Sequence, residues 1–220
     1  MATGKRPVLT NEERALVEAA VQAAEQRTSA EIVPMIVERS GLYREAQHRA
    51  GLLFALLTLT ALLTIESAWL PWGWHAANAA WLLLATVAAY ALGAWSGTWS
   101  PIIRLLTSRE RMHQKVRLRA ERAFVQHGIA RTRGRTGLLL MLSLLERQVY
   151  VLADQSLRER ISSDQWQDVI AVVVERMKAG DLAGGLCRGI EASGVLLARA
   201  CPSDRRDNPN ELSNEVIQDA

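Results

Sequence analysis

The segment TGLLLMLSLLERQVYVLAD, from Thr136 to Asp154, decides the fold of this 220-residue chain. An apolar run over 138–143 and a second over 149–153 flank a short polar stretch, Glu146-Arg147-Gln148. This pattern predicts two strands joined by a tight turn. The first run is apolar on both sides, as expected of a strand that helices cover on both faces. A Leu-rich helix is the competing interpretation, because the turn lacks a glycine or an Asn-Gly pair.

Helical patterns and one more strand surround this segment. A capping box at Thr10–Glu13 predicts a helix to about Gln26. Further helices are predicted over 107–127, 164–178 and 181–199, with Gly128 and Gly180 ending the first two. The stretch 31–37 reads as a strand in which Pro34 cannot donate a hydrogen bond, which predicts an edge position or a bulge.

Two long apolar runs interrupt this pattern. Residues 50–65 give sixteen uncharged positions, about 24 Å as a helix. A bilayer core is roughly 30 Å thick, so this first helix must continue towards Trp69 to cross it. Residues 76–103 give 28 uncharged positions, which is enough to cross. A buried hairpin would need a larger soluble core than this chain can build, so we predict transmembrane spans at about 50–69 and 77–99.

Aromatic and small residues fit a membrane hairpin. Tryptophans gather near both ends of the second span, at Trp69, Trp72, Trp74, Trp95 and Trp99. Indole rings prefer the headgroup level of a bilayer. A stripe of small residues, Ala89, Gly93 and Gly97, recurs every four positions and allows another helix to approach closely. Either the hairpin's own packing or a dimer could use this stripe.

Positive charge flanks the hairpin on both outer sides. Arg39, Arg44 and Arg49 precede the first span, while the connection 66–75 contains no Lys or Arg. The positive-inside rule therefore places both soluble arms in the cytoplasm. We predict an integral protein of the inner membrane with both termini cytoplasmic.

A strongly basic stretch follows the second span. From Arg104 to Arg135 the chain has ten Lys or Arg and two Glu, a balance of +8. Six of these cations are predicted to contact anionic lipid headgroups: Arg104, Arg109, Arg111, Lys115, Arg117 and Arg119. Each basic residue near such a surface contributes about 1 kcal/mol. Nucleic-acid binding is disfavoured, because the stretch has few aromatic side chains for base stacking, and we predict no nucleic-acid partner.

These patterns divide the chain into five segments. They are a disordered N-terminus (1–9), the first part of a soluble domain (10–49), the transmembrane hairpin (50–103), the second part of the soluble domain (104–201) and a polar, poorly ordered tail (202–220).

The segment from Thr136 to Asp154 resembles the central motif of TPM-domain proteins. In that family a Thr-x-Gly-type entry leads to an apolar strand, a Glu-Arg-x-Val hairpin and a second strand that ends in Ala-Asp. The stretch Glu31-Ile-Val-Pro34 resembles the family's first strand, and the stretch from Gly180 to Pro202 resembles its last helix. The stretch from Asn208 to Leu212 resembles a tail of short, membrane-anchored bacterial members. The resemblance covers most of 10–53 and 107–216, with the hairpin as an insertion.

The resemblance implies an α/β fold in which a small mixed sheet is sandwiched between helices, interrupted here by the two-helix transmembrane hairpin. Relatives are described as acid phosphatases, as calcium-binding proteins or as proteins of membrane-complex assembly and repair. After Asp154 the family usually has a basic residue, Gly and Ile, whereas this chain has Gln155, Ser156 and Leu157. Without that glycine, a backbone that closely surrounds a phosphate or an ion is less favoured.

Asp154 is the main candidate for a metal ligand, because it follows a strand at a position where carboxylates of α/β folds often do chemistry. Together with Glu31 or Glu146 it could hold a hard cation such as Ca²⁺ through oxygen atoms. The competing and favoured interpretation is a solvated Asp that caps the next helix. We assign no catalytic residue and predict no other cofactor.

The stretch Gly185-Leu-Cys187-Arg-Gly189 matches a nucleophile elbow with Cys in place of Ser. That motif requires a strand before it and a helix after it, but here it lies inside a helical pattern. We therefore interpret these glycines as positions where a helix packs closely on the sheet.

Two functions from different classes follow. The first is a membrane-anchored TPM-like domain protein that acts as a binding or assembly module at the cytoplasmic membrane surface and binds a membrane protein partner or a second copy. The alternative is a metal-dependent, phosphatase-like hydrolase that uses Asp154. The hydrolase ranks second, because a catalyst needs convergent carboxylates and the sequence offers one candidate Asp.

Overall fold

The computed structural model describes residues 8–69, 76–203 and 210–219, with the side chains of 66–69 and 76–78 left aside. The chain forms two compact units. The sheet unit comprises the chain up to Ser40 and from His113 onward, and the hairpin unit comprises Gly41–Met112. The sheet unit is therefore built from two stretches of sequence that the hairpin unit separates.

The sheet unit contains a four-stranded mixed sheet in the order β3-β2-β1-β4. The strands are β1 (Glu31–Val37), β2 (Gly137–Ser143), β3 (Gln148–Ala153) and β4 (Ile217–Asp219). β1 pairs parallel with both β2 and β4, whereas β2 and β3 form an antiparallel hairpin in which Leu138 lies opposite Ala153. The two predicted strands at 138–153 are confirmed, and the Leu-rich helix is excluded.

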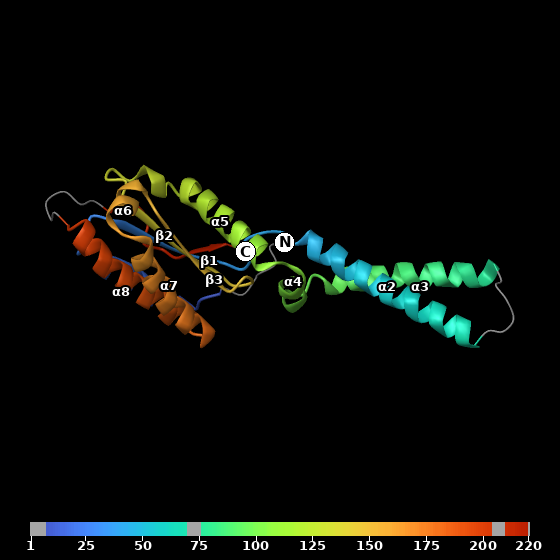
Figure 1. The fold of residues 1–220 in the computed structure, drawn as a ribbon. Coiled ribbons are helices and arrows are strands. Elements are labelled where there is room, and N and C mark those ends of the chain that lie inside the picture. The colour runs from blue at the N-terminus through green and yellow to red at the C-terminus, as the bar shows by residue number, and fades with distance from the viewer. Residues whose placement is uncertain (1–7, 70–75, 204–209, 220) are drawn as a thin grey trace. The chain divides into compact units, whose positions relative to one another are not determined.

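Helices cover both faces of this sheet (Figure 1). On one face lie α1 (Asn11–Glu25), α7 (Ser163–Lys178) and α8 (Leu182–Ala200), and on the other lie α5 (Arg109–Gln126) and a 3-10 turn, η1 (Ile129–Arg131). Side chains of β2 alternate between two cores, with Leu138, Leu140 and Leu142 in the first and Leu139 and Met141 in the second. The predicted α/β fold with a sandwiched mixed sheet is therefore confirmed.

The ends of the helices follow the predicted signals. The Thr10 side chain accepts from Glu13 N–H at 3.2 Å, and the Glu13 carboxylate accepts from Thr10 N–H at 2.7 Å. Gly128 and Gly180 have φ values of 70° and 83°, in the left-handed region that favours glycine. A short helix that the sequence did not predict, α6 (Gln155–Arg160), follows β3.

The hairpin unit contains α2 (Arg44–Trp69), α3 (Ala76–Ser96) and α4 (Ser100–Leu106). Both α2 and α3 are long and apolar enough to cross a membrane. Residues 70–75 of the connection between the predicted spans, including Trp72 and Trp74, lie outside the described residues. Pro101 occupies the first turn of α4, so the apolar run to Ile103 is two helices and not one.

Two expectations about the sheet were wrong. Pro34 lies in a central strand, since β1 is between β2 and β4. The β1–β4 ladder begins only at Met35, so Pro34 lies just outside it and loses no hydrogen bond on that side. The tail, expected to be poorly ordered, supplies β4, and Asp219 C=O accepts from Glu38 N–H at 3.2 Å.

Candidate functional site

Two of the predicted metal ligands lie at the same end of the sheet. Glu31 begins β1 opposite Gly137, and the Asp154 N–H donates to the Gly137 carbonyl at 2.9 Å. The two carboxylates therefore belong to the strands on either side of β2. Both side chains are buried, with Asp154 at 7% and Glu31 at 4% exposure.

Asp154 uses one carboxylate oxygen and leaves the other unsatisfied. Its Oδ1 accepts from Gln155 N–H at 2.7 Å, at the start of α6. Its Oδ2 is buried and has no hydrogen-bond partner in the described part of the chain. The residue is thus a helix cap, as predicted, but it is buried and not solvated. Its second oxygen is a buried acceptor that a donor or a cation could satisfy.

Glu31 faces the tail and a second glutamate that the sequence did not single out. Its Oε2 accepts from Leu212 N–H at 3.3 Å, and burial raises the pKa of its carboxyl. Burial likewise raises the pKa of Glu25 from 4.5 to about 7. Both glutamates line a cavity of about 550 Å³ with Asn210 and Asn214. Glu25 ends α1 shortly before Glu31 in the chain, and the charge of Glu31 adds to the rise in its pKa.

Glu146 lies at the opposite end of β2, in the turn between β2 and β3. It accepts from Ser40 N–H at 2.9 Å and also from the Ser143 hydroxyl. The structure therefore does not bring Glu146 together with Asp154 and Glu31.

The carboxylates at the Asp154 end do not complete a calcium site. Calcium takes six to eight oxygen ligands. Within residues 8–69, 76–203 and 210–219, no group of three or more His, Cys, Asp or Glu side chains is placed to hold a metal. The cation site stays a prediction, and no chemical step is derived through it.

Several of the basic residues predicted to contact lipid already have protein partners. Arg111 pairs with Glu45, and Arg119 pairs with Asp219. Arg117 pairs with Glu121 at 2.7 Å. These pairs leave less positive charge for contact with lipid headgroups than the sequence alone suggests. Two of the three acids lie far from their partners in the chain, which is why the sequence did not reveal them.

The small-residue stripe packs within the hairpin unit. Ala89 is buried. A methyl group built on Gly93 would lie 2.7 Å from the Ala50 carbonyl, and one on Gly97 would lie 2.6 Å from the Gln47 Cα. Of the two uses left open, this geometry corresponds to close packing of α3 on α2.

Cys187 lies within α8 and has helix on both sides, so it is not at a strand-to-helix elbow. A methyl group built on Gly189 would lie 2.4 Å from Val173 Cγ2 and 3.1 Å from Leu140 Cδ2. This glycine allows α8 to approach α7 and β2, as interpreted from the sequence.

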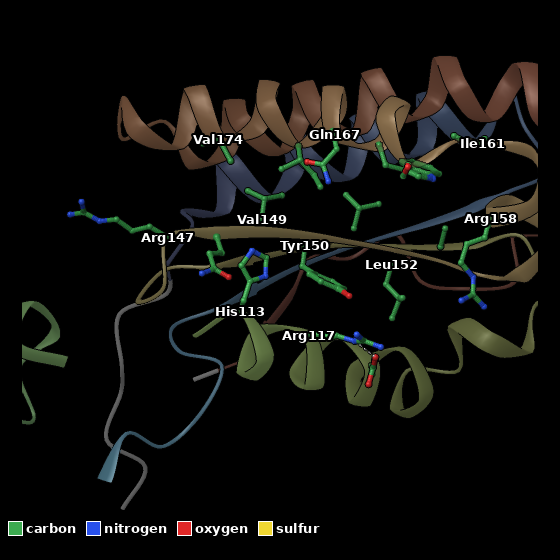
Figure 2. Close-up of a pocket in the computed structure, with 17 residues that line it drawn as sticks. His113, Arg117, Arg147, Val149, Tyr150, Leu152, Arg158, Ile161, Gln167 and Val174 are labelled. Atoms are coloured by element: carbon green, nitrogen blue, oxygen red, sulfur yellow. Dashed lines mark hydrogen bonds and ion pairs between the residues drawn. The ribbon is translucent and has the colours of Figure 1, made fainter. Parts of the chain in front are cut away.

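A groove of about 740 Å³ follows the outer strand β3 (Figure 2). Val149, Tyr150 and Leu152 of β3 lie along its floor, between His113 and Arg117 of α5 on one side and Gln167 and Val174 of α7 on the other. No local pattern in the sequence indicates this groove, because its two walls are about 50 residues apart in the chain.

Comparison with known proteins agrees with this architecture. The family model of the TPM domain matches residues 100–195. The NMR structure of the BA42 protein from the psychrophilic bacterium Bizionia argentinensis superposes with a TM-score of 0.60, covering 99% of each chain at 18% identity, which shows likeness of fold alone. No curated protein matches the chain. The predicted resemblance to the TPM-domain family is therefore confirmed, and residues 100–195 are the part of the chain that carries it.

Proposed function

We propose that this protein is a membrane-anchored binding and assembly module, with its TPM-like sheet unit at the cytoplasmic surface of the inner membrane. The hairpin unit anchors it in the bilayer, and the sheet unit recruits a membrane protein partner. The module needs no catalytic activity for this role.

The observation that carries the proposal is the exposure of large apolar side chains on α2 and α3. Leu56 is 62% exposed and Leu83 is 70% exposed, and only 11% of each candidate span is buried. Contiguous apolar surface of this kind is rare on soluble proteins and marks a contact with lipid or with another protein. A core helix of a soluble protein would bury the same side chains.

The ends of the hairpin unit support the proposed orientation. Trp95 and Trp99 pack edge to face with ring centroids 5.9 Å apart, and both are exposed. Exposed indoles next to an apolar helix suit the headgroup level of a bilayer. Arginines flank the hairpin outside its connection, which has no Lys or Arg, and this asymmetry favours a cytoplasmic sheet unit.

The experiment is alkaline carbonate extraction of membranes that contain the full chain. We expect the protein to stay in the pellet, and the double substitution Leu56→Arg with Leu83→Arg to release it. The control, Val172→Arg on the exposed face of α7, should stay in the pellet. Release of the unsubstituted protein would overturn the proposal.

The hydrolase alternative draws its support from the unsatisfied Oδ2 of Asp154. The proposal predicts no turnover of a generic phosphomonoester by the full chain in detergent, with or without calcium or magnesium. Metal-dependent turnover that Asp154→Asn abolishes would favour the hydrolase. A calcium-dependent rise in melting temperature that Asp154→Asn abolishes, without turnover, would support a cation at this end of the sheet.

A further inference from the structure

Within the described residues, the outer edge of β3 pairs with no other strand. In an antiparallel ladder, residue pairs that share hydrogen bonds alternate with pairs that do not. The Asp154 N–H donates to the Gly137 carbonyl, so these two residues form a hydrogen-bonded pair. The backbone N–H and C=O groups of Val149, Val151 and Ala153 therefore point away from β2. In the described residues no hydrogen bond outside the ladder reaches these groups.

The groove along this edge has two walls of different character. Towards α7 it is apolar, formed by Val149, Val151, Trp166 and Ile170. Towards α5, Tyr150 and the Arg117–Glu121 pair make it polar. An added strand would present alternate side chains to these two walls, since successive residues of a strand point to opposite faces.

The groove carries an excess of positive charge. Arg147 and Arg158 lie at its two ends (Figure 2), both exposed and without an ion-pair partner in the described part of the chain. Glu121 is the one acid among the described residues that line it, and it already pairs with Arg117. The surplus cations favour an acidic occupant.

Two buried polar atoms of groove-lining residues are also unsatisfied. Trp166 is 8% exposed, and its indole N–H has no partner among the described residues. The side-chain oxygen of Gln148 likewise has none. Buried donors and acceptors in native proteins are normally paired, so a ligand in the groove that reached these two atoms would satisfy them.

We propose that this groove binds an extended acidic segment of a partner protein, which adds a fifth strand to the sheet along β3. Backbone hydrogen bonds to Val149, Val151 and Ala153 hold the segment, as in other cases of strand addition. Its apolar side chains face α7, and its carboxylates face α5 and the arginines at the two ends. This proposal rests on the proposed role of the protein as a binding module.

A second copy of this chain is a poorer occupant. Antiparallel pairing of two β3 strands would bring Arg147 of one copy towards Arg158 of the other, and parallel pairing would bring like residues together. Like charges opposite one another destabilise strand pairing.

The test uses the full chain in lipid nanodiscs and fluorescent eight-residue peptides. We expect a peptide of alternating Val and Glu to bind at least tenfold more tightly than one of alternating Val and Lys, by fluorescence anisotropy. Two further versions of the Val-Glu peptide carry methyl groups on alternate backbone nitrogens, one on the odd-numbered residues and one on the even-numbered residues. One version should lose binding and the other should keep it, because only one set of peptide N–H groups faces β3. Equal effects of the two methylation patterns would overturn the proposal.

Matched variants separate binding from folding. Val151→Pro removes one outward N–H, which an edge strand tolerates, and should weaken binding of the Val-Glu peptide at least tenfold. Arg147→Glu with Arg158→Glu should reverse the preference in favour of the Val-Lys peptide, which a misfolded protein could not do. Arg199→Glu, an exposed change on α8, should leave binding unchanged.

Failure of this proposal is distinguishable from failure of the proposed function. Absence of peptide binding to a chain that resists carbonate extraction would refute the β3 site and leave the membrane module standing. Peptide binding by a chain that carbonate extraction releases would support the β3 site and refute the membrane module.

Discussion

The carboxyl of Glu25 couples folding to pH. Burial raises its pKa to about 7 in the folded chain, against 4.5 when unfolded. The folded state therefore holds the proton more tightly between these values. The stability that this group contributes is complete below about pH 4.5 and is lost as the pH rises through about 7.

Glu25→Gln should remove this pH dependence. The amide oxygen can still accept from Ile32 N–H, which donates to the carboxylate at 2.9 Å. We expect the free energy of unfolding to rise by about 1–2 kcal/mol at pH 8, after allowance for partial solvent exposure, and to change little at pH 5. Urea unfolding of the full chain in detergent measures both values. An unchanged pH dependence, equal to that of the exposed control Glu175→Gln, would contradict this account.

Glu146 acts in this structure as an acceptor that holds the β2–β3 turn. Glu146→Ala would leave the Ser40 N–H and the Ser143 hydroxyl without their acceptor. We expect a loss of about 2–4 kcal/mol in the free energy of unfolding, because hydrogen bonds to a charged group contribute about 1.5–3 kcal/mol each. Glu146→Gln keeps one acceptor oxygen and should cost less. Equal losses for both variants would count against the acceptor role.

At the residue scale the sequence located candidate groups but not their neighbours. Asp154 could be interpreted as a cap, because an Asp before a helix is a local signal. That Glu146 bonds to Ser40, 106 residues away, follows only from the pairing of β1 with β2. No local pattern contains that information.

At the element scale, local patterns predicted most helices and three strands. Caps, glycine stops and apolar runs depend on neighbouring residues, so these elements could be read from the chain. β4 could not, because three residues of a polar tail become a strand only by pairing with β1. The same non-local pairing makes β1, the strand that contains Pro34, a central strand of the sheet.

The close approach of α2 and α3 gives an element-scale prediction. Gly97→Val would insert a branched side chain where even a methyl group would lie 2.6 Å from Gln47 Cα. We expect a loss of about 1–3 kcal/mol, typical of overpacking, measured by unfolding of the full chain in mild detergent. Ala91→Val, on the exposed side of α3, is the matched control and should change stability little. Comparable losses in both variants would refute the packing role of Gly97.

At the scale of the whole molecule, the hairpin unit splits the sheet unit into two stretches of sequence. β1 precedes the hairpin unit and β2 follows it, yet the two strands pair along seven residues. The apolar runs made the insertion visible in the sequence, since charge is nearly absent from 50–103. The Arg111–Glu45 and Arg119–Asp219 ion pairs and the groove along β3 were not visible, because each joins residues from distant segments.

The central claim is that α2 and α3 lie in lipid, and spin-label accessibility tests it most directly. Single labels would be placed at Leu57, Leu84 and Glu175 of a full chain lacking Cys187 and Cys201, reconstituted in liposomes. The account predicts that labels at Leu57 and Leu84 collide more with oxygen than with a water-soluble nickel complex, and that the label at Glu175 does the reverse. Nickel accessibility at Leu57 and Leu84 equal to that at Glu175 would contradict it.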